Sequence, residues 1–141
     1  MKTILVSLTV LLAAGNLHAA DPIGDAFPAA RAALNLIYQA ETNSGKNLRP
    51  GDGGKALGHL QQHAAHWREG CRFLGVRWDW RRDSLDLEKC EHVAVAYWCL
   101  YARKYLLAGN VDELILRFRK PGNPYAADNL AYLQRVKDGA K

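Results

Sequence analysis

The feature that most constrains the fold is a long apolar segment between Asp86 and Ala108. Its apolar residues fall on nearly every side of a helix, and not on a single stripe. A helix that is apolar all round needs burial on every side, so it belongs in the middle of a small domain with other helices around it. Glu88 in its first turn and Gly109 just after its last residue are typical of helix ends. The apolar residues are Val93, Ala94, Ala96, Tyr97, Leu100, Tyr101, Leu107 and Ala108.

Four further helices are expected around this central helix, from apolar residues at helical spacing and from helix-end residues. The first has Asp25 as its N-cap, accommodates Pro28 in its first turn and runs to about Thr42. The second is ended by Gly70. The expected ranges are residues 25–42, 62–70, 111–118 and 128–137.

The remaining segments offer little regular structure. Residues 55–61 are expected to form a short strand or an extended edge, and residues 72–83 a loop rich in aromatic and basic residues. The sequence therefore predicts a mainly α (α+β) fold, with five to six helices around a central apolar helix and at most a small β-hairpin beside a cleft.

The N-terminal segment has the features of a secretory signal peptide. Lys2 supplies its positive charge, residues 4–14 are apolar, and cleavage is expected after Ala19 or Ala20. The rest, residues 21–141, is enough for one domain with a single core. No other segment is long and apolar enough to span a bilayer. We therefore expect a secreted or periplasmic monomer, and retention of residues 1–20 as an anchor is the alternative.

Three cysteines lie in the exported part of the chain: Cys71, Cys90 and Cys99. Export permits a disulfide bond. Cys90 and Cys99 are nine residues apart on one expected helix, so they point to opposite faces and are unable to pair with each other. Cys71 could pair with either of them, and three free thiols are the alternative.

A carboxylate, Glu41, continues the buried stripe of the first helix. An acid on a face directed at the core is partly desolvated, which raises its pKa. A general acid for glycosidic cleavage at neutral pH needs a raised pKa of this kind. The stripe that Glu41 extends is formed by Phe27, Ala30, Leu34, Ile37 and Tyr38.

A second carboxylate, Asp52, follows in a turn that contains Gly51, Gly53 and Gly54. Glycines permit backbone angles that other residues avoid, and they leave room for a bulky ligand. Glycosidases commonly place a second carboxylate across the scissile bond from the acid. The alternative is an ordinary helix-terminal acid and an ordinary turn residue, because turns favour Asp and Gly for local reasons.

The order of residues around these carboxylates is similar to a known pattern. Glu41 is followed by the segment 51–61, which ends in Gly-His-Leu-Gln, and then by His63 and Trp67. This order resembles the active-site segment of the lysozyme-like superfamily. The resemblance is closest to the invertebrate-type (destabilase) lysozymes and their bacterial relatives, and more distant to goose-type lysozymes and lytic transglycosylases. It extends more weakly to residues 97–105 and 121–136, and it implies a single lysozyme-like domain over residues 21–141.

The resemblance implies a muramidase that cleaves the β-1,4 bond between MurNAc and GlcNAc in peptidoglycan glycan strands. Glu41 would be the general acid and Asp52 the second carboxylate. Two alternatives are a lytic transglycosylase that uses Glu41 alone and a non-catalytic cell-wall binding protein on the same scaffold. A third is an enzyme for another GlcNAc polymer, such as chitin. The substrate-binding residues that the resemblance implies are Gln61, His63, Trp67, Asn123 and Tyr125.

The chain departs from the family pattern in two places. Gln62 stands where relatives usually carry an aliphatic residue, and residues 119–125 replace the expected His-Asn-Gly-Gly-Pro turn. The second departure affects part of the substrate floor. Two of the implied contacts also have ordinary alternatives: Gln61 could hydrogen-bond the loop, and Trp67 could pack in the core.

Other chemistries have little support in the sequence. His59, His63 and His66 would share one face of a continuous helix, but the His-Glu-x-x-His pattern is missing, so we expect no metal and no cofactor. Residues 77–82 mix Arg and Trp, as a surface that binds a nucleic-acid strand might. A glycan surface or a salt-bridged loop with Asp79 and Asp83 fits an exported protein better, so no nucleic-acid partner is expected. The net charge of +5, or +4 without Lys2, suits an anionic polymer.

Overall fold

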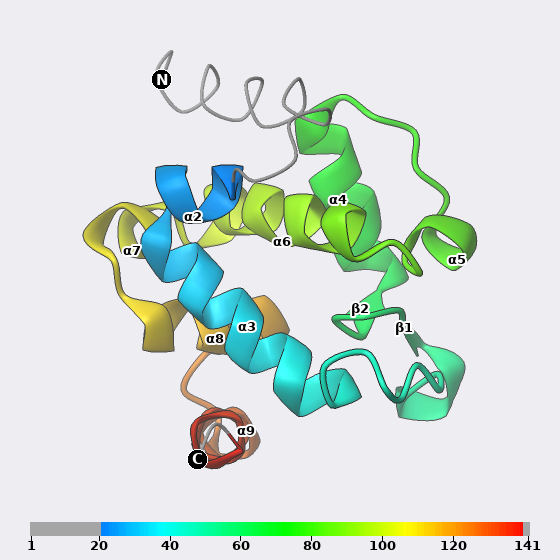
Figure 1. The fold of residues 1–141 in the computed structure, drawn as a ribbon. Helices are drawn as coiled ribbons and strands as arrows, with labels where there is room; N and C mark the ends of the chain where they lie inside the picture. Colours follow the sequence, from blue (N-terminus) through cyan, green and yellow to red (C-terminus); the bar gives the residue numbers. More distant parts are fainter. Residues whose placement is uncertain (1–20, 140–141) are drawn as a thin grey trace.

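A computed structural model describes residues 21–139, so the predicted signal peptide and its cleavage site lie outside the described residues. The described residues form eight α-helices, one short 3-10 helix and one two-stranded antiparallel sheet (Figure 1), which confirms the mainly α (α+β) fold class. None of these helices has the length and apolar character needed to cross a membrane. In chain order the elements are α2 (Pro22–Ala26), α3 (Pro28–Thr42), η1 (Asp52–Gly54), β1 (Ala56–Leu57), β2 (Gln62–His63), α4 (Ala64–Leu74), α5 (Trp80–Asp83), α6 (Leu87–Tyr101), α7 (Arg103–Ala108), α8 (Val111–Arg119) and α9 (Ala127–Asp138).

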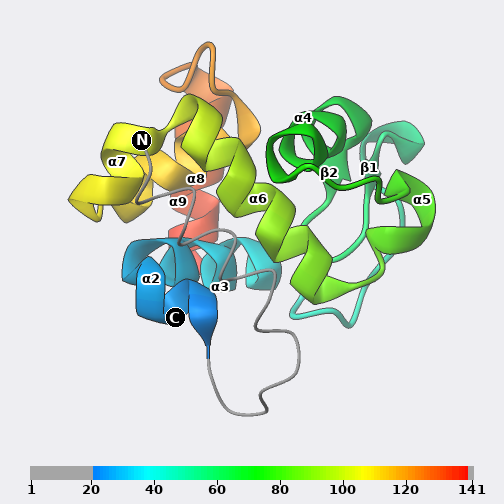
Figure 2. The same cartoon turned by 90° about the horizontal axis from the view of Figure 1, so that it is seen from above.

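Helix α6 is the central helix that the sequence predicts. Residues 92–96 are all buried, so the middle of α6 has no solvent-exposed face. In Figure 2, α6 runs between two groups of elements. Helices α4 and α5 and the β1–β2 hairpin lie on one side, and α2, α3, α7, α8 and α9 lie on the other. The apolar character of α6 is thus explained by packing on both sides.

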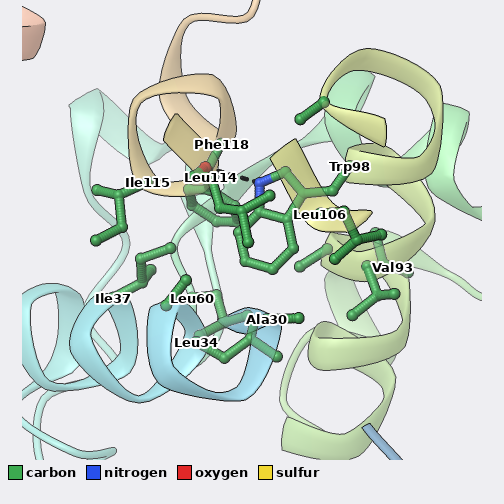
Figure 3. Close-up of a cluster of buried hydrophobic side chains, with 14 of the residues drawn as sticks. Ala30, Leu34, Ile37, Leu60, Val93, Trp98, Leu106, Leu114, Ile115 and Phe118 are labelled. Atoms are coloured by element: carbon green, nitrogen blue, oxygen red, sulfur yellow. Dashed lines mark hydrogen bonds between the residues drawn. The ribbon is translucent and has the colours of Figure 1, made fainter. Parts of the chain in front are cut away.

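The core is formed mainly where α3, α6 and α8 meet (Figure 3). Trp98 of α6 is fully buried, and its indole Nε1 donates a hydrogen bond to the carbonyl oxygen of Leu114 at 2.8 Å. Leu34 and Ile37 of α3 and Leu60 of the hairpin turn pack in the same cluster. Each such side chain contributes about 1.5–3 kcal/mol of burial free energy, so the core fixes α3 and the hairpin relative to α6.

The segment predicted as one helix over residues 86–108 is two helices. Asp86 caps α6 by accepting a hydrogen bond from the Lys89 amide, but α6 ends at Ala102, whose φ is −139°. Helix α7 follows and ends at Gly109, in the left-handed conformation expected there. Around this break Ala102 and Leu106 are buried, whereas three other apolar residues are exposed: Leu100, Tyr101 and Leu107.

The first predicted helix is also divided. Asp21, and not Asp25, caps α2, because its side chain accepts a hydrogen bond from the Gly24 amide at 3.0 Å. Pro28 begins α3 and lies in the first turn, as predicted. The short helices α2, α5 and α7 raise the number of helices to eight, above the expected five to six.

Gly70 lies inside α4 and does not end it. The helix continues to Leu74 and is ended by Gly75, whose φ is +72°. A Cβ atom on Gly70 would lie 2.7 Å from the carbonyl oxygen of Val93 and 2.8 Å from its Cγ1 atom. This glycine therefore allows α4 and α6 to pack closely, a contact that the local sequence pattern does not reveal.

The expected disulfide bond is wrong, and the alternative of three free thiols holds. Cys71, Cys90 and Cys99 are buried separately and unpaired. Burial raises the pKa of Cys90 to about 12 and that of Cys99 to about 11, so both thiols stay protonated. The Cys90 thiol donates a hydrogen bond to the carbonyl oxygen of Ser84 at 3.1 Å.

Candidate active site

A cavity of about 550 Å³ is lined by residues from both groups of elements that flank α6. Its volume falls in the range of about 300–1,000 Å³ found for ligand sites. The small hairpin lies beside it, as predicted, because Ala56, Gln62 and His63 belong to its lining. The other lining residues are Glu41, Gly51, Asp52, Gln61, Ala65, His66, Tyr97, Phe118, Arg119, Lys120, Tyr132 and Arg135.

Glu41 is half-buried in the last turn of α3 and lines the cavity. The end of α3 is fixed by its neighbour Thr42, which is fully buried. The Thr42 hydroxyl lies 3.1 Å from the carbonyl oxygen of Tyr38 and 3.0 Å from that of His59, and it accepts a hydrogen bond from the Gly45 amide. These contacts join α3 to the hairpin turn, so the Glu41 carboxylate is held at the cavity wall.

Tyr132 of α9 lines the same cavity as Glu41 and interacts with it electrostatically. Its side chain is 4% exposed. Burial raises the pKa of Tyr132 well above its usual value, and the neighbouring Glu41 carboxylate raises it further. Tyr132 is therefore a neutral phenol beside the candidate general acid. Within residues 21–139, Glu41 forms no ion pair.

Asp52 lies at the open rim of the cavity. Its φ is +49°, and Gly53 and Gly54 also have positive φ, which explains the glycines of this turn. The Oδ2 atom of Asp52 lies 3.2 Å from Nε2 of His63, and the two side chains are 63% and 52% exposed. Since both groups are well solvated, the pair adds little to stability. Its effect is to orient the Asp52 carboxylate.

Gln61 lines the cavity, but both ends of its amide are bonded to the loop. Its Oε1 accepts a hydrogen bond from the Gly51 amide at 2.8 Å, and its Nε2 donates to the carbonyl oxygen of Gly58 at 3.0 Å. The structural alternative for this residue is therefore the better supported one. By joining the two turns, Gln61 holds η1 and Asp52 against the hairpin.

The hairpin itself is seated on the turn between α5 and α6. Gly58 has a φ of +75°, and a Cβ atom there would lie 2.0 Å from the carbonyl oxygen of Ser84. The His59 ring donates from Nε2 to the carbonyl oxygen of Leu85 at 3.0 Å. A buried hydrogen bond from Gln62 Nε2 to the carbonyl oxygen of Cys90 anchors β2 to α6 at 3.1 Å.

Three buried polar residues of the cavity lining have atoms without a hydrogen-bond partner in the described part of the protein. They are Gln62, through Oε1, His66, through Nε2, and Tyr132, through its hydroxyl. The His66 ring stacks on Tyr97 with centroids 3.8 Å apart. Burial lowers the pKa of His66 to about 3, so its imidazole is neutral. Gln62 thus places a buried amide in the cavity wall.

Three residues predicted to contact substrate are not part of the cavity lining. Trp67 is 2% exposed and packs in the core, with its Nε1 donating to the carbonyl oxygen of Trp78 at 3.1 Å. Tyr125 donates from its hydroxyl to Glu113 at 2.6 Å, and Asn123 is exposed in the preceding turn. The core alternative for Trp67 is correct, and ligand contacts by these three residues in this cavity are not supported.

Three cations that the sequence analysis did not assign to the site complete the lining. Arg119 and Lys120 end α8, and Arg135 lies on α9. The basic run at residues 117–120 was visible in the sequence. The resemblance to lysozymes predicts only a missing turn at residues 119–125. In the structure the same segment brings the positive charges of Arg119 and Lys120 to the cavity.

The histidines and the Arg/Trp segment have separate structural roles. His59, His63 and His66 lie in a turn, a strand and a helix, and residues 21–139 contain no group of three or more His, Cys, Asp or Glu that could hold a metal ion. Residues 72–83, predicted as a loop, contain the end of α4 and the short helix α5, and the salt bridges considered above form at Asp83 in α5. Arg82 and Lys89 each lie 2.8 Å from the Asp83 carboxylate and hold its pKa well below the usual value.

Comparison of the chain with protein-family models, curated proteins and solved structures gives no significant match. The lysozyme resemblance therefore depends on the motif that begins at Glu41 and on nothing outside this chain.

Proposed function

We propose that this protein is an exported enzyme that cleaves the MurNAc-β-1,4-GlcNAc bond of peptidoglycan. The observation that supports this most strongly is the meeting of Glu41, Asp52 and His63 at one cavity, since these residues come from the segment that resembles a lysozyme active site. The protein would then act on glycan strands in the periplasm or outside the cell. A single lysozyme-like domain over residues 21–141 is part of the same proposal.

In this mechanism Glu41 is the proton donor. It protonates the glycosidic oxygen as the bond to C1 breaks, and its half-buried position on α3 limits competition from bulk water. Asp52 faces the cationic sugar ring that develops at C1, or orients the water that attacks it. His63 is a positioning residue, because its Nε2 lies 3.2 Å from the Asp52 carboxylate.

The rest of the lining suits a saccharide. Tyr97 and Phe118 offer aromatic surface for the apolar face of a sugar ring. Gln62 Oε1 and His66 Nε2 have no partner in the described protein and can hydrogen-bond the hydroxyl or N-acetyl groups of a ligand. A cavity that combines polar groups with a few aromatic rings is typical of ligand sites.

The second candidate is a lytic transglycosylase that uses Glu41 alone. It is favoured by the position of Asp52, which is 63% exposed and already paired with His63. In this route Glu41 first gives its proton to the leaving oxygen and then accepts the proton of the 6-hydroxyl of MurNAc. That hydroxyl attacks C1 of the same sugar, so the product ends in an anhydro ring and no water is consumed.

The proposal is tested by the clearing of purified sacculi with the Glu41→Gln variant. We predict a loss of at least about 100-fold in rate, because general acid catalysis contributes on that order, while binding to sacculi is retained. Glu88→Gln is the matched control, since Glu88 is an exposed acid in the first turn of α6. Clearing by Glu41→Gln at the wild-type rate would overturn the proposal.

The same assay separates the remaining candidates. Mass spectrometry of the products gives reducing ends for a hydrolase and anhydro-MurNAc ends for a transglycosylase. Asp52→Asn should lose much less activity in the second case. Binding of the wild-type protein to sacculi without any clearing would leave a non-catalytic cell-wall binding protein.

A further inference from the structure

We infer that the cavity selects a glycan that carries carboxylates, and that Arg119, Lys120 and Arg135 form the wall that binds those carboxylates. The preference for an acidic saccharide is a property of the described side chains. The identification of the saccharide as peptidoglycan depends on the proposed function.

The two arginines are held in place by an aromatic ring. The guanidinium carbons of Arg119 and Arg135 each lie 5.2 Å from the ring centroid of Tyr132. Tyr132 is buried, so it gives both cations a fixed partner. Arg119 also donates from Nη1 to the backbone carbonyl oxygen of Asp128 at 3.0 Å. The guanidinium groups are therefore ordered before a ligand arrives, which lowers the entropic cost of binding.

Three cations face two carboxylates, Asp128 and Glu41, on this side of the cavity, so positive charge is in excess by one. Lys120 lies 2.6 Å from the Asp128 carboxylate, and Arg119 lies 3.5 Å from it. One carboxylate is thus shared between two cations, and Arg135 adds a third positive charge. Arg119 and Lys120 keep 40% and 39% of their side chains exposed, so a ligand can reach them. Guanidinium groups bind carboxylates with two parallel hydrogen bonds, which makes them well suited to this role.

This chemistry separates two classes of GlcNAc polymer. Peptidoglycan has the lactyl carboxylate of MurNAc and the carboxylates of its stem peptides, whereas chitin has no carboxylate. The segment 119–125, which departs from the expected family turn, supplies two of the three cations. Its effect in this chain is to add charge recognition to the cavity.

The test measures binding in the Glu41→Gln background, which prevents turnover. The probes are the tetrasaccharide (GlcNAc-MurNAc)2 with free lactyl carboxylates, the same tetrasaccharide with these groups converted to methylamides, and chitotetraose. We expect the acidic probe to bind about tenfold more tightly than either neutral probe, since one charged hydrogen bond contributes about 1.5–3 kcal/mol. A fourth probe with stem peptides and methylamide-blocked lactyl groups shows which carboxylate is used.

The variants make the test specific. R119Q/K120Q should reduce the tenfold preference to less than about threefold, on the same reasoning. Its matched control is R103Q/K104Q, which removes two exposed cations from α7, outside the cavity lining. Arg135 lies on the exposed side of α9, and the single variant R135Q should reduce the tenfold preference to about threefold or less. It provides a second measurement if the double variant unfolds.

The outcomes distinguish this inference from the proposed function. The inference is overturned if the acidic and methylamide probes bind with equal affinity and the peptide-bearing probe binds no more tightly than these two. This holds even if sacculi are cleared. An unchanged preference in folded R119Q/K120Q and R135Q overturns it as well. A preference that the two variants remove supports the inference, and it does so even if the wild-type protein fails to clear sacculi, in which case the proposed cleavage alone is wrong.

Discussion

Among single residues, His66 shows most clearly how burial controls protonation in this protein. Its ring lies between Tyr97 and Phe118, and burial lowers its pKa to about 3. In an unfolded chain an imidazole has a pKa of about 6.5. At a pH between these two values the unfolded chain binds more protons than the folded chain. Stability therefore falls as the pH decreases below about 6.5.

We predict that His66→Phe removes this loss. Between pH 7 and pH 5, His66 should lower the free energy of unfolding of the wild-type protein by about 2 kcal/mol, from 1.36 kcal/mol for each unit of pKa difference. Phe keeps the aromatic contact with Tyr97 and does not titrate. Urea unfolding at pH 7, 6 and 5 measures the effect. Equal dependence on pH in the two proteins would show that His66 does not act in this way.

At the scale of elements, two glycines have nearly the same backbone conformation but different surroundings. Comparing them distinguishes the cost of backbone strain from the cost of a steric clash. Gly58 and Gly109 have φ values of +75° and +72°. A Cβ atom on Gly58 would lie 2.0 Å from the carbonyl oxygen of Ser84, whereas one on Gly109 would meet nothing within 4 Å. The position of the hairpin beside the cavity therefore depends on the absence of a side chain at Gly58.

We predict that Gly109→Ala lowers the free energy of unfolding by about 1–2 kcal/mol, the cost of a left-handed residue with a Cβ atom. Gly58→Ala should cost about 1–3 kcal/mol more, because the added carbon forces the hairpin away from Ser84. Chemical denaturation measures both values. Clearing of sacculi should fall in Gly58→Ala only, and similar behaviour of the two variants would contradict this account.

The elements that the sequence predicts best are those whose ends are set locally. The ranges of α8 and α9 agree with the expected ones to within a residue, and Pro28 begins α3. The errors arise from contacts between elements. Gly70 looks like a helix end but lies inside α4 because Val93 packs against it, and Ala102 interrupts an apolar segment that has no local break signal.

Considered as a whole molecule, the domain is held together without a covalent cross-link among its cysteines. Cys71, Cys90 and Cys99 are each buried, and burial raises the pKa of each thiol. A protonated and inaccessible thiol reacts slowly with oxidants and alkylating reagents. The core thus protects these thiols even where the surroundings would permit a disulfide bond.

We predict that the native protein, without reductant, shows almost no reaction with a thiol reagent over minutes and that three thiols react in denaturant. Mass spectrometry after alkylation in denaturant counts the modified cysteines. The same measurement after prior reduction is the control. A gain of modified cysteines on reduction would show that a disulfide bond forms and that the described arrangement is incomplete.

The same distinction between local and distant contacts explains which part of the site the sequence predicts. Glu41, Asp52, Gln61 and His63 belong to one short stretch of chain, so their joint arrival at the cavity follows from a motif. The opposite wall comes from α8 and α9, and only the folded chain brings these helices to the hairpin. For that reason its aromatic ring and cations had no recognisable pattern. They are Arg119, Lys120, Tyr132 and Arg135.

The close approach of α4 to α6 at Gly70 influences how large a ligand the cavity can hold. His66 of α4 and Tyr132 of α9 belong to different walls of the cavity. The distance between these walls depends on how closely α4 packs against α6. A bulkier residue at position 70 would push α4 away from α6 and widen the cavity without changing the identity of any lining residue. The width of the cavity therefore depends on Gly70, a residue outside its lining.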